Sequence, residues 1–287
     1  MKKFRYILKT MRPKQWIKNF FVFPALLFSK SFTDPRAIGL SVLAFLLFSL
    51  GSGTVYIIND VIDRKKDILH PRKCKRPIAS GKLKAGEALA AAAMILIGVV
   101  AAAAYVSIKF MGILVLYILI TILYSLKLKS TPILDILAIA AGFVLRTLSG
   151  AVIIGVEASS WLLLCTSALC LFLAANKRKT ELETMKEAAG EYKASLGVYT
   201  LPFLNQIITV CLTLCIVLYA LYTYYTKVPY MMGTTAFVFY GLCRYQLLMA
   251  AGELGDNIEV TLLKDKPMVL NLVLWGLSCL AIIWKFY

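Results

Sequence analysis

The sequence predicts an all-α protein that crosses a membrane many times, and three observations predict it. Of the 287 residues, 60% are hydrophobic, whereas an ordinary soluble domain is nearer half apolar. The mean hydropathy is +0.77. The apolar residues gather in runs of about 20, the length at which a helix spans a bilayer. We therefore expect about nine transmembrane helices in one integral-membrane domain that covers residues 1–287.

The apolar runs place the predicted helices in order. They lie at 17–32, 37–58, 86–106, 111–127, 133–154, 160–176, 197–223, 233–251 and 267–285. The first run is short and contains Pro24, so we expect it to be kinked or only partly inserted. The third run is rich in alanine, which suits close helix packing. The second and sixth runs each lead into a long charged loop, at 59–85 and 177–196.

The net charge of +17 is explained by membrane topology and not by nucleic acid. The basic residues gather at the N-terminus and in the loops 59–85, 127–132, 177–196 and 252–266. Positively charged loops stay on the cytoplasmic side. The expected location is a bacterial-type inner (plasma) membrane, with the N-terminus and the charged loops in the cytoplasm and the C-terminus outside.

The seven cysteines predict no disulfide framework and no metal site. Their number is odd, no CxxC occurs, and six of them lie inside apolar runs. Such cysteines are usually small buried apolar residues.

The stretch NDVIDRKKDILHPRKCKRPIASG, which begins at Asn59, carries the most informative chemistry. Asp60, Asp63 and Asp67 are spaced i, i+3 and i+7, so on a helix they share one face. Neighbouring carboxylates repel one another unless a cation lies between them. Mg²⁺ prefers such oxygen ligands and completes its shell with water and phosphate. The alternative is a solvated loop in which the acids pair with neighbouring bases.

Basic residues flank these aspartates and predict phosphate contacts. They are Arg64, Lys65, Arg72, Lys73, Lys75, Arg76, Lys82 and Lys84. Carboxylates that hold a metal and cations that hold phosphate oxygens together predict a metal–diphosphate ligand. We assign the metal to Asp60, Asp63 and Asp67, and the catalytic positions to Asn59, Asp60 and Asp63.

These motifs resemble those of the UbiA superfamily of intramembrane prenyltransferases. NDVIDRKKD fits the family's first aspartate-rich motif, NDxxDxxxD, and KRPIASG fits the basic segment after it. The resemblance implies a helical bundle with cytoplasmic active-site loops and Mg²⁺-dependent chemistry. The second aspartate cluster of the family is replaced here by AANKRKTELETMKEAAGEY, which contains no aspartate. Its cations suit a second anionic substrate.

Four further segments resemble one branch of the superfamily, the decaprenyl-phosphate phosphoribosyltransferases. The segments are MRPKQWIKNFFVFP, YSLKLKSTPILDILAIAAGFVLRTLSGA, LAANKRKTEL and RYQLLMAAGELGDNIEVTLLKDKPM. The resemblance implies transfer of a 5-phosphoribosyl group from phosphoribosyl diphosphate to a polyprenyl phosphate, in cell wall biosynthesis. The lipid phosphate is ionised at neutral pH, so no general base is needed, and His70 is interpreted as a loop residue.

Residues at the depth of a lipid phosphate are assigned to substrate or phosphate binding as a group. They are Lys14, Lys18, Asn19, Lys73, Arg76, Lys127, Lys129, Lys177, Arg178 and Glu181. Glu259 and Asp265 are candidates for closing the site. Arg146 and Arg244 lie inside apolar runs, where a lone charge usually faces a partner or a cavity.

Two other functions are compatible with the sequence. One is a prenyltransferase that moves a prenyl group from prenyl diphosphate to an aromatic or other acceptor, which a second aspartate cluster would favour. The other is a transporter or lipid-binding membrane protein whose charged loops only orient the chain. Transporters often carry broken helices in matched positions, and Pro24 and Pro132 do not form such a pair.

Overall fold

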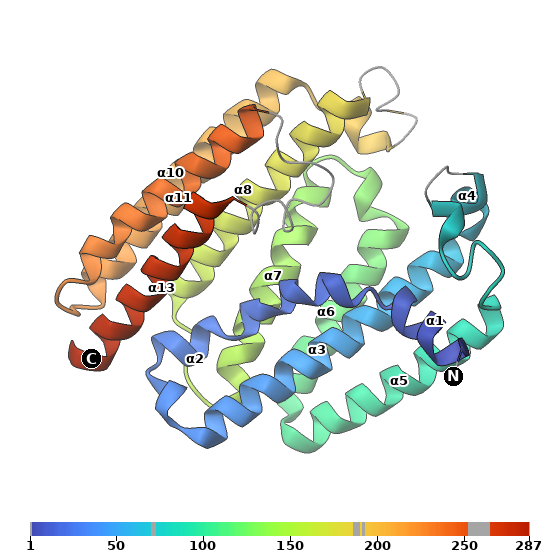
Figure 1. Cartoon of the computed structure of the whole chain (residues 1–287), viewed down its shortest axis with the longest axis horizontal. Coiled ribbons are helices and arrows are strands. Elements are labelled where there is room, and N and C mark those ends of the chain that lie inside the picture. Colours follow the sequence, from blue (N-terminus) through green and yellow to red (C-terminus); the bar gives the residue numbers. More distant parts are fainter. Residues whose placement is uncertain (1, 70–72, 186–189, 191–192, 252–264, 287) are drawn as a thin grey trace. The chain divides into compact units, whose positions relative to one another are not determined.

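A computed structural model of the chain forms two compact units, Met1–Ala158 and Ser159–Tyr287. The residues described are 2–69, 73–185, 190, 193–251 and 265–286. Every regular element among them is helical, as predicted. Figure 1 shows the helices in sequence colours.

The first unit is built around one long helix. That helix is α3, and the elements of the unit are α1 (Lys2–Thr10), η1 (Pro13–Val22), α2 (Pro24–Phe28), η2 (Ser31–Thr33), α3 (Pro35–Ile62), α4 (Arg64–Leu69), η3 (Lys73–Lys75), α5 (Ala85–Val106), α6 (Ile108–Leu126), η4 (Leu128–Ser130) and α7 (Leu134–Ile153). Helix α3 packs against α5, α6, α7 and the 3₁₀ helix η1. Phe48, Phe110 and Leu114 are fully buried in the core between these helices.

The second unit contains two pairs of packed helices, α8 with α10 and α11 with α13. Its elements are α8 (Ser160–Met185), η6 (Ala194–Gly197), α10 (Leu201–Tyr225), η7 (Met231–Thr234), α11 (Thr235–Ala250) and α13 (Lys266–Phe286). Asp265 precedes α13 and accepts a hydrogen bond from the Met268 amide at 2.8 Å, which caps the helix. Its carboxylate also accepts two hydrogen bonds from Arg244.

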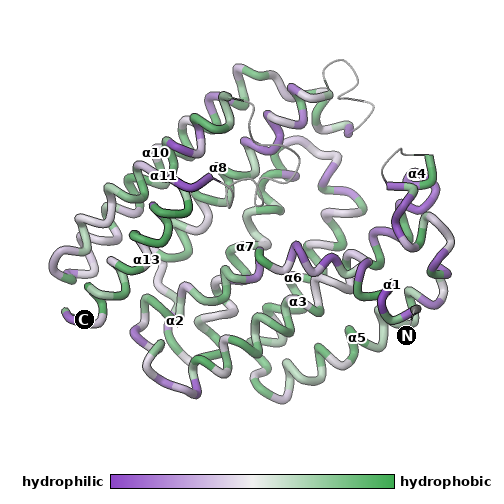
Figure 2. The backbone as a smooth tube through the Cα atoms, in the orientation of Figure 1, coloured by the Kyte–Doolittle hydropathy of each residue, from purple (hydrophilic) through white to green (hydrophobic). Residues whose placement is uncertain are grey.

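The protein is a multi-pass membrane protein, although the predicted count of nine spans is not confirmed. Seven described helices are long and apolar enough to cross a membrane: α3, α5, α6, α7, α8, α10 and α13. Figure 2 shows that these helices are mainly hydrophobic, while hydrophilic residues gather around α1 and α4. Helix α11 occupies the eighth predicted range with only 16 residues, fewer than the roughly 20 that span a bilayer.

The predicted helix at 17–32 is not one helix. The chain forms η1 up to Val22 and the short α2 from Pro24. Proline has no amide hydrogen and its ring obstructs the preceding turn, so Pro24 begins a new helix and ends the old one. The segment is broken more thoroughly than the kink we predicted.

Two helices extend further than predicted. The predicted helix at 160–176 continues as α8 to Met185, so Lys177, Arg178 and Glu181 lie on a helix and not in a loop. Most of the residues in KRKTELETM are good helix formers, and ion pairs at i, i+3 and i, i+4 link four of them. Similarly, α3 continues to Ile62 and places Asn59 in its last turns.

The seven cysteines are all free. Four of them are buried, whereas Cys243 is exposed and does not follow the prediction of burial.

Candidate active site

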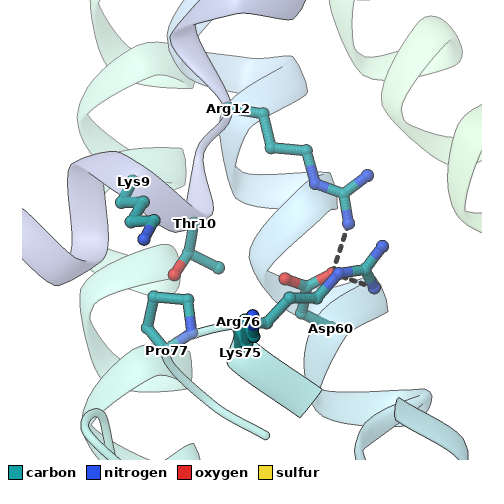
Figure 3. Close-up of a pocket in the computed structure, with 7 residues that line it drawn as sticks. All are labelled: Lys9, Thr10, Arg12, Asp60, Lys75, Arg76 and Pro77. Atoms are coloured by element: carbon teal, nitrogen blue, oxygen red, sulfur yellow. Dashed lines mark hydrogen bonds and ion pairs between the residues drawn. The ribbon is translucent and has the colours of Figure 1, made fainter. Parts of the chain in front are cut away.

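Asp60 forms the centre of a charged cluster at the end of α3. Its side chain is only 2% exposed. The Arg12 Nη2 atom donates to Asp60 Oδ1 at 2.5 Å, and the Arg76 Nη1 atom donates to the same oxygen at 3.1 Å. Figure 3 shows the two guanidinium groups converging on this carboxylate. Two cations therefore offset part of the cost of burying this one acid.

Asp67 joins the cluster through Arg76. Its carboxylate, on α4, is buried and accepts from Arg76 Nη1 at 2.6 Å. One nitrogen atom of Arg76 thus lies between two carboxylates, those of Asp60 and Asp67. The two aspartates do not share a face of one helix as predicted, because Asp63 ends α3 and Asp67 lies on α4, but both contact the same cation.

Asp63 lies apart from this cation. It ends α3, where its amide donates to the Asn59 carbonyl at 2.9 Å. Its carboxylate is 3.7 Å from Lys129 Nζ. The second aspartate of the motif therefore brings Lys129, a predicted phosphate ligand, to the edge of the cluster. The alternative in which acids pair with bases describes part of this arrangement.

Local backbone geometry directs the side chains of Arg12 and Arg76 toward Asp60. Arg12 has φ 54° and ψ 64°, a left-handed conformation that turns the chain between α1 and Pro13. Arg76 begins a tight loop in which its carbonyl accepts from the Ser80 amide at 2.8 Å. Gly81 closes the loop with φ 74°, a region that glycine enters readily. Ile78 is buried below the loop and anchors it against the core.

A pocket of about 280 Å³ opens beside Asp60. Its lining residues come from α1, η3, α3 and the turns between them (Figure 3): Lys9, Thr10, Arg12, Asp60, Lys75, Arg76 and Pro77. The lining holds four cations and one acid. Such a concentration of positive charge attracts an anion of high charge density, such as a phosphate or diphosphate.

The donor set fits a hard divalent cation. Asp60 Oδ1 and Asp67 Oδ2 both lie within 3.1 Å of Arg76 Nη1. The guanidinium of Arg76 is thus a cation positioned between two carboxylates. Mg²⁺ is bound by one or two carboxylates together with water and phosphate. Within the described ranges, no three His, Cys, Asp or Glu side chains form a group that could hold a metal. A bound ion would therefore take the rest of its shell from the ligand.

The other predicted residues divide by unit. In the first unit, Lys14 and Lys127 are exposed, and Lys18 and Lys73 are half-buried. Asn19 is buried and is not among the residues that line the pocket. It forms a hydrogen bond with Ser49 at 3.0 Å.

On α8 in the second unit, Lys177 is exposed and Arg178 is buried. Arg178 donates a hydrogen bond to Glu181. Among the sequence-predicted residues, His70, Arg72 and Glu259 lie outside the described residues.

Arg12 is the ion-pairing site residue that sequence reasoning missed, and Lys9 and Thr10 of the pocket lining were missed with it. Arg12 stands in the quoted segment MRPKQWIKN, but we assigned only the lysines and asparagine of that segment to the site. The signal was an Arg-Pro step after a basic amphipathic helix, which marks a turn. No spacing rule connects it to Asp60, 48 residues later.

Comparison with known proteins places these features in a family. The profile of the UbiA prenyltransferase family matches residues 19–178. The chain is 31% identical to decaprenyl-phosphate phosphoribosyltransferase of Mycolicibacterium smegmatis, over 94% of this chain and 89% of the relative. It is 33% identical to the protein of the same name from Corynebacterium glutamicum, over 75% of this chain and 66% of the relative.

Solved structures share the fold. A UbiA homolog from Archaeoglobus fulgidus, bound to DMAPP and Mg²⁺, superposes with a TM-score of 0.72 and 19% identity, over 98% of this chain and 99% of that one. A digeranylgeranylglyceryl phosphate synthase superposes with a TM-score of 0.68 and 20% identity, over 98% of each chain. At these identities the likeness concerns the fold.

Proposed function

The chain belongs to the UbiA prenyltransferase family, and we propose that it transfers a 5-phosphoribosyl group from phosphoribosyl diphosphate to a polyprenyl phosphate, releasing diphosphate. The relatives named above support the polyprenyl phosphate acceptor and the transfer of a phosphoribosyl group. The replacement of the second aspartate cluster by KRKTELETM also favours an anionic acceptor.

The observation that carries the proposal is the pairing of Asp60 with Arg12 and Arg76 beside a basic pocket. Carboxylates and cations meet at one point, which suits a diphosphate that arrives with a metal ion. Asp60 and Asp67 would hold Mg²⁺, with Asp63 and Asn59 beside them. When bound, Mg²⁺ neutralises charge on the leaving diphosphate.

The residues of the chain bind and orient the donor. Lys9, Arg12, Lys75 and Arg76 offer hydrogen bonds to phosphate oxygens. A phosphate oxygen of the lipid attacks C1 of the ribose, the bond from C1 to the diphosphate breaks, and its electron pair leaves with the diphosphate. The nucleophile is already ionised, and the seven residues that line the pocket include no histidine.

The remaining predicted cations do not line the pocket, and their assignment to phosphate binding rests on their positions in the sequence. They are Lys14, Lys18, Lys73, Lys127, Lys129, Lys177 and Arg178, with Glu181 as the partner of Arg178. We treat residues 1–287 as one catalytic domain in a bacterial-type inner membrane. Its N-terminus and charged loops face the cytoplasm, where phosphoribosyl diphosphate would be supplied.

The test is an assay of purified protein in detergent with polyprenyl phosphate, Mg²⁺ and radiolabelled phosphoribosyl diphosphate. Label should move into the organic phase, and EDTA should stop the transfer. Asp60→Asn should lower the rate by at least about 100-fold, the scale of a lost electrostatic contact at a reacting centre. Asp34→Asn is the matched control, since Asp34 is exposed and asparagine caps a helix equally well.

A parallel reaction holds prenyl diphosphate and 4-hydroxybenzoate. Prenylated aromatic product with no lipid-bound label would replace the proposal with the prenyltransferase function. No product in either reaction, with the protein folded, would favour the transporter or lipid-binding alternative.

A further inference from the structure

The buried guanidinium of Arg146 connects three elements of the first unit. The residue lies near the middle of α7 and is 7% exposed. Its Nε donates to Asn19 Oδ1 at 2.8 Å, its Nη2 to the Tyr117 hydroxyl at 2.7 Å, and its Nη1 to the Gly142 carbonyl at 2.9 Å. The group also lies over the Tyr117 ring, 4.5 Å from the centroid.

All of these partners are neutral. No described carboxylate pairs with Arg146, and the residue is not among the seven that line the pocket. A charge buried at membrane depth is costly. Here three acceptors and two aromatic faces, those of Tyr117 and Phe143, compensate it. The rigid planar fork of arginine is needed to reach acceptors in three directions.

Asn19 carries the connection to η1. Its side chain is 1% exposed, with the carbonyl oxygen on Arg146 and the amide group donating to Ser49 of α3. One amide thus ties η1 to both α7 and α3. The end of η1 also rests on α7, because a Cβ atom at Gly150 would lie 1.9 Å from the Val22 carbonyl oxygen.

The N-terminal end of η1 lies at the candidate active site. Arg12 caps η1 in a left-handed conformation and donates to Asp60. Asn19 lies seven positions after Arg12, which is about 14 Å along the axis at the rise of a 3₁₀ helix. A 3₁₀ helix has poor hydrogen-bond geometry and is rarely this long, so its position depends on side-chain anchors.

From these contacts we infer that Arg146 is a positioning residue for the active site: it holds Asn19 and η1 so that Arg12 meets Asp60. Arg146 touches no substrate in this scheme. It acts on the donor end of the pocket through η1. The kinetic part of the inference depends on the proposed function, and the structural part does not.

Hydrogen exchange tests the structural part. In Arg146→Gln, the amides of residues 14–22 should exchange at least about fivefold faster, while those of α8 and α10 stay unchanged. Arg146→Lys keeps the charge but loses the fork, and should loosen η1 nearly as much. Lys109→Gln, an exposed lysine with the same loss of charge, is the control. Unchanged exchange at 14–22 in Arg146→Gln would overturn the inference.

Kinetics test the coupling to Arg12. Arg146→Gln should raise KM for phosphoribosyl diphosphate about tenfold and leave KM for the polyprenyl phosphate within about twofold. In an Arg12→Gln background the same change should have an effect below about twofold, since acting through Arg12 makes the losses non-additive. If the losses caused by the two substitutions multiply, or if only the KM for the lipid rises, Arg146 instead binds the acceptor.

A second variant covers the case in which Arg146→Gln does not fold. Asn19→Ala leaves the bonds of Arg146 to Tyr117 and Gly142 in place, and should reproduce both the faster exchange and the raised donor KM. Normal exchange in Asn19→Ala would contradict the inference. If exchange responds in these variants but no assay shows turnover, the positioning role stands and the proposed function fails.

Discussion

At the scale of single residues, the site is a balance of two arginines and two buried aspartates. Arg76 places one nitrogen between Asp60 and Asp67, and Arg12 adds a second cation to Asp60. Removing one partner of a buried ion pair leaves an uncompensated charge. Loss of either arginine should therefore destabilise the folded protein.

Arg76→Met should expose this balance. Without the guanidinium, two buried carboxylates face each other, and we expect the free energy of unfolding to fall by about 3 kcal/mol. Mg²⁺ should restore most of the loss in the variant and change the wild type less, because the ion takes the vacated position. Thermal unfolding with Mg²⁺ or EDTA measures both effects.

Arg36→Met serves as the control, since Arg36 is exposed at the far end of α3. Equal Mg²⁺ responses in Arg76→Met and wild type would argue against Asp60 and Asp67 as the metal ligands.

The structure brings together the residues that we grouped because they are close in the sequence. Asp60, Asp67 and Arg76 lie within 17 positions of one another and were assigned to one site from their spacing. Arg12 and the Asn19–Arg146 pair depend on contacts across 48 and 127 residues. Such contacts follow from the packing of η1, which no periodicity in the sequence reveals.

At the scale of elements, η1 packs between α3 and α7. The backbone of η1 can approach α7 closely because α7 has Gly150 where the Val22 carbonyl meets it. The 3₁₀ helix η1 was not predicted, since we expected one helix at 17–32, kinked or only partly inserted. Proline at both 13 and 24 was the available sign that the segment has its own boundaries.

Gly150→Ala should displace η1. The new methyl group would overlap the Val22 carbonyl, and overpacking of this kind costs about 1–3 kcal/mol. We expect a lower melting temperature and a loss of transferase activity, both measured in detergent. Gly98→Ala on α5 is the control, because a Cβ atom there meets open space and alanine favours a helix. If both variants behave alike, close approach at Gly150 is not the cause.

The start of α13 should be sensitive to acid. A hydrogen bond from Arg244 holds the pKa of Asp265 below its usual range, so the carboxyl stays ionised more readily when folded than when unfolded. Its contribution to stability is complete above the unfolded pKa, near 4, and is lost as pH falls through the folded value.

Melting temperature should consequently fall more between pH 7 and about pH 3 in the wild type than in Asp265→Asn, which keeps a capping side chain. Parallel pH dependence in the two proteins would show that the Arg244 contact does not contribute.

At the scale of the whole molecule, composition was a sufficient guide to the class of protein. Seven of the predicted ranges correspond to helices of membrane-spanning length, because hydrophobicity over 20 residues is a strong signal. The total of nine is not confirmed, since the apolar run at 17–32 forms η1 and α2 and α11 has 16 residues. The division into two compact units had no counterpart in the sequence analysis.

The distribution of charge predicts the orientation of the chain. Basic residues in the N-terminal segment and in the loops at 59–85 and 177–196 should keep these parts in the cytoplasm. An alkaline phosphatase fused after the last residue should then be active, and green fluorescent protein at the same place should be dark. A fluorescent fusion would mean an even number of crossings.

The length of α8 makes the position of its cations depend on the thickness of the surrounding membrane. Its 26 residues form a rod of about 39 Å, longer than the roughly 30 Å hydrocarbon layer of a typical bilayer. The cations near its end are therefore carried on a rigid extension, and their height above the lipid tails depends on the acyl chain length of the surrounding lipids. A thicker membrane would draw Lys177 and Lys179 toward the headgroups, so the lipid composition of the host helps to set where this end of the helix meets a lipid phosphate.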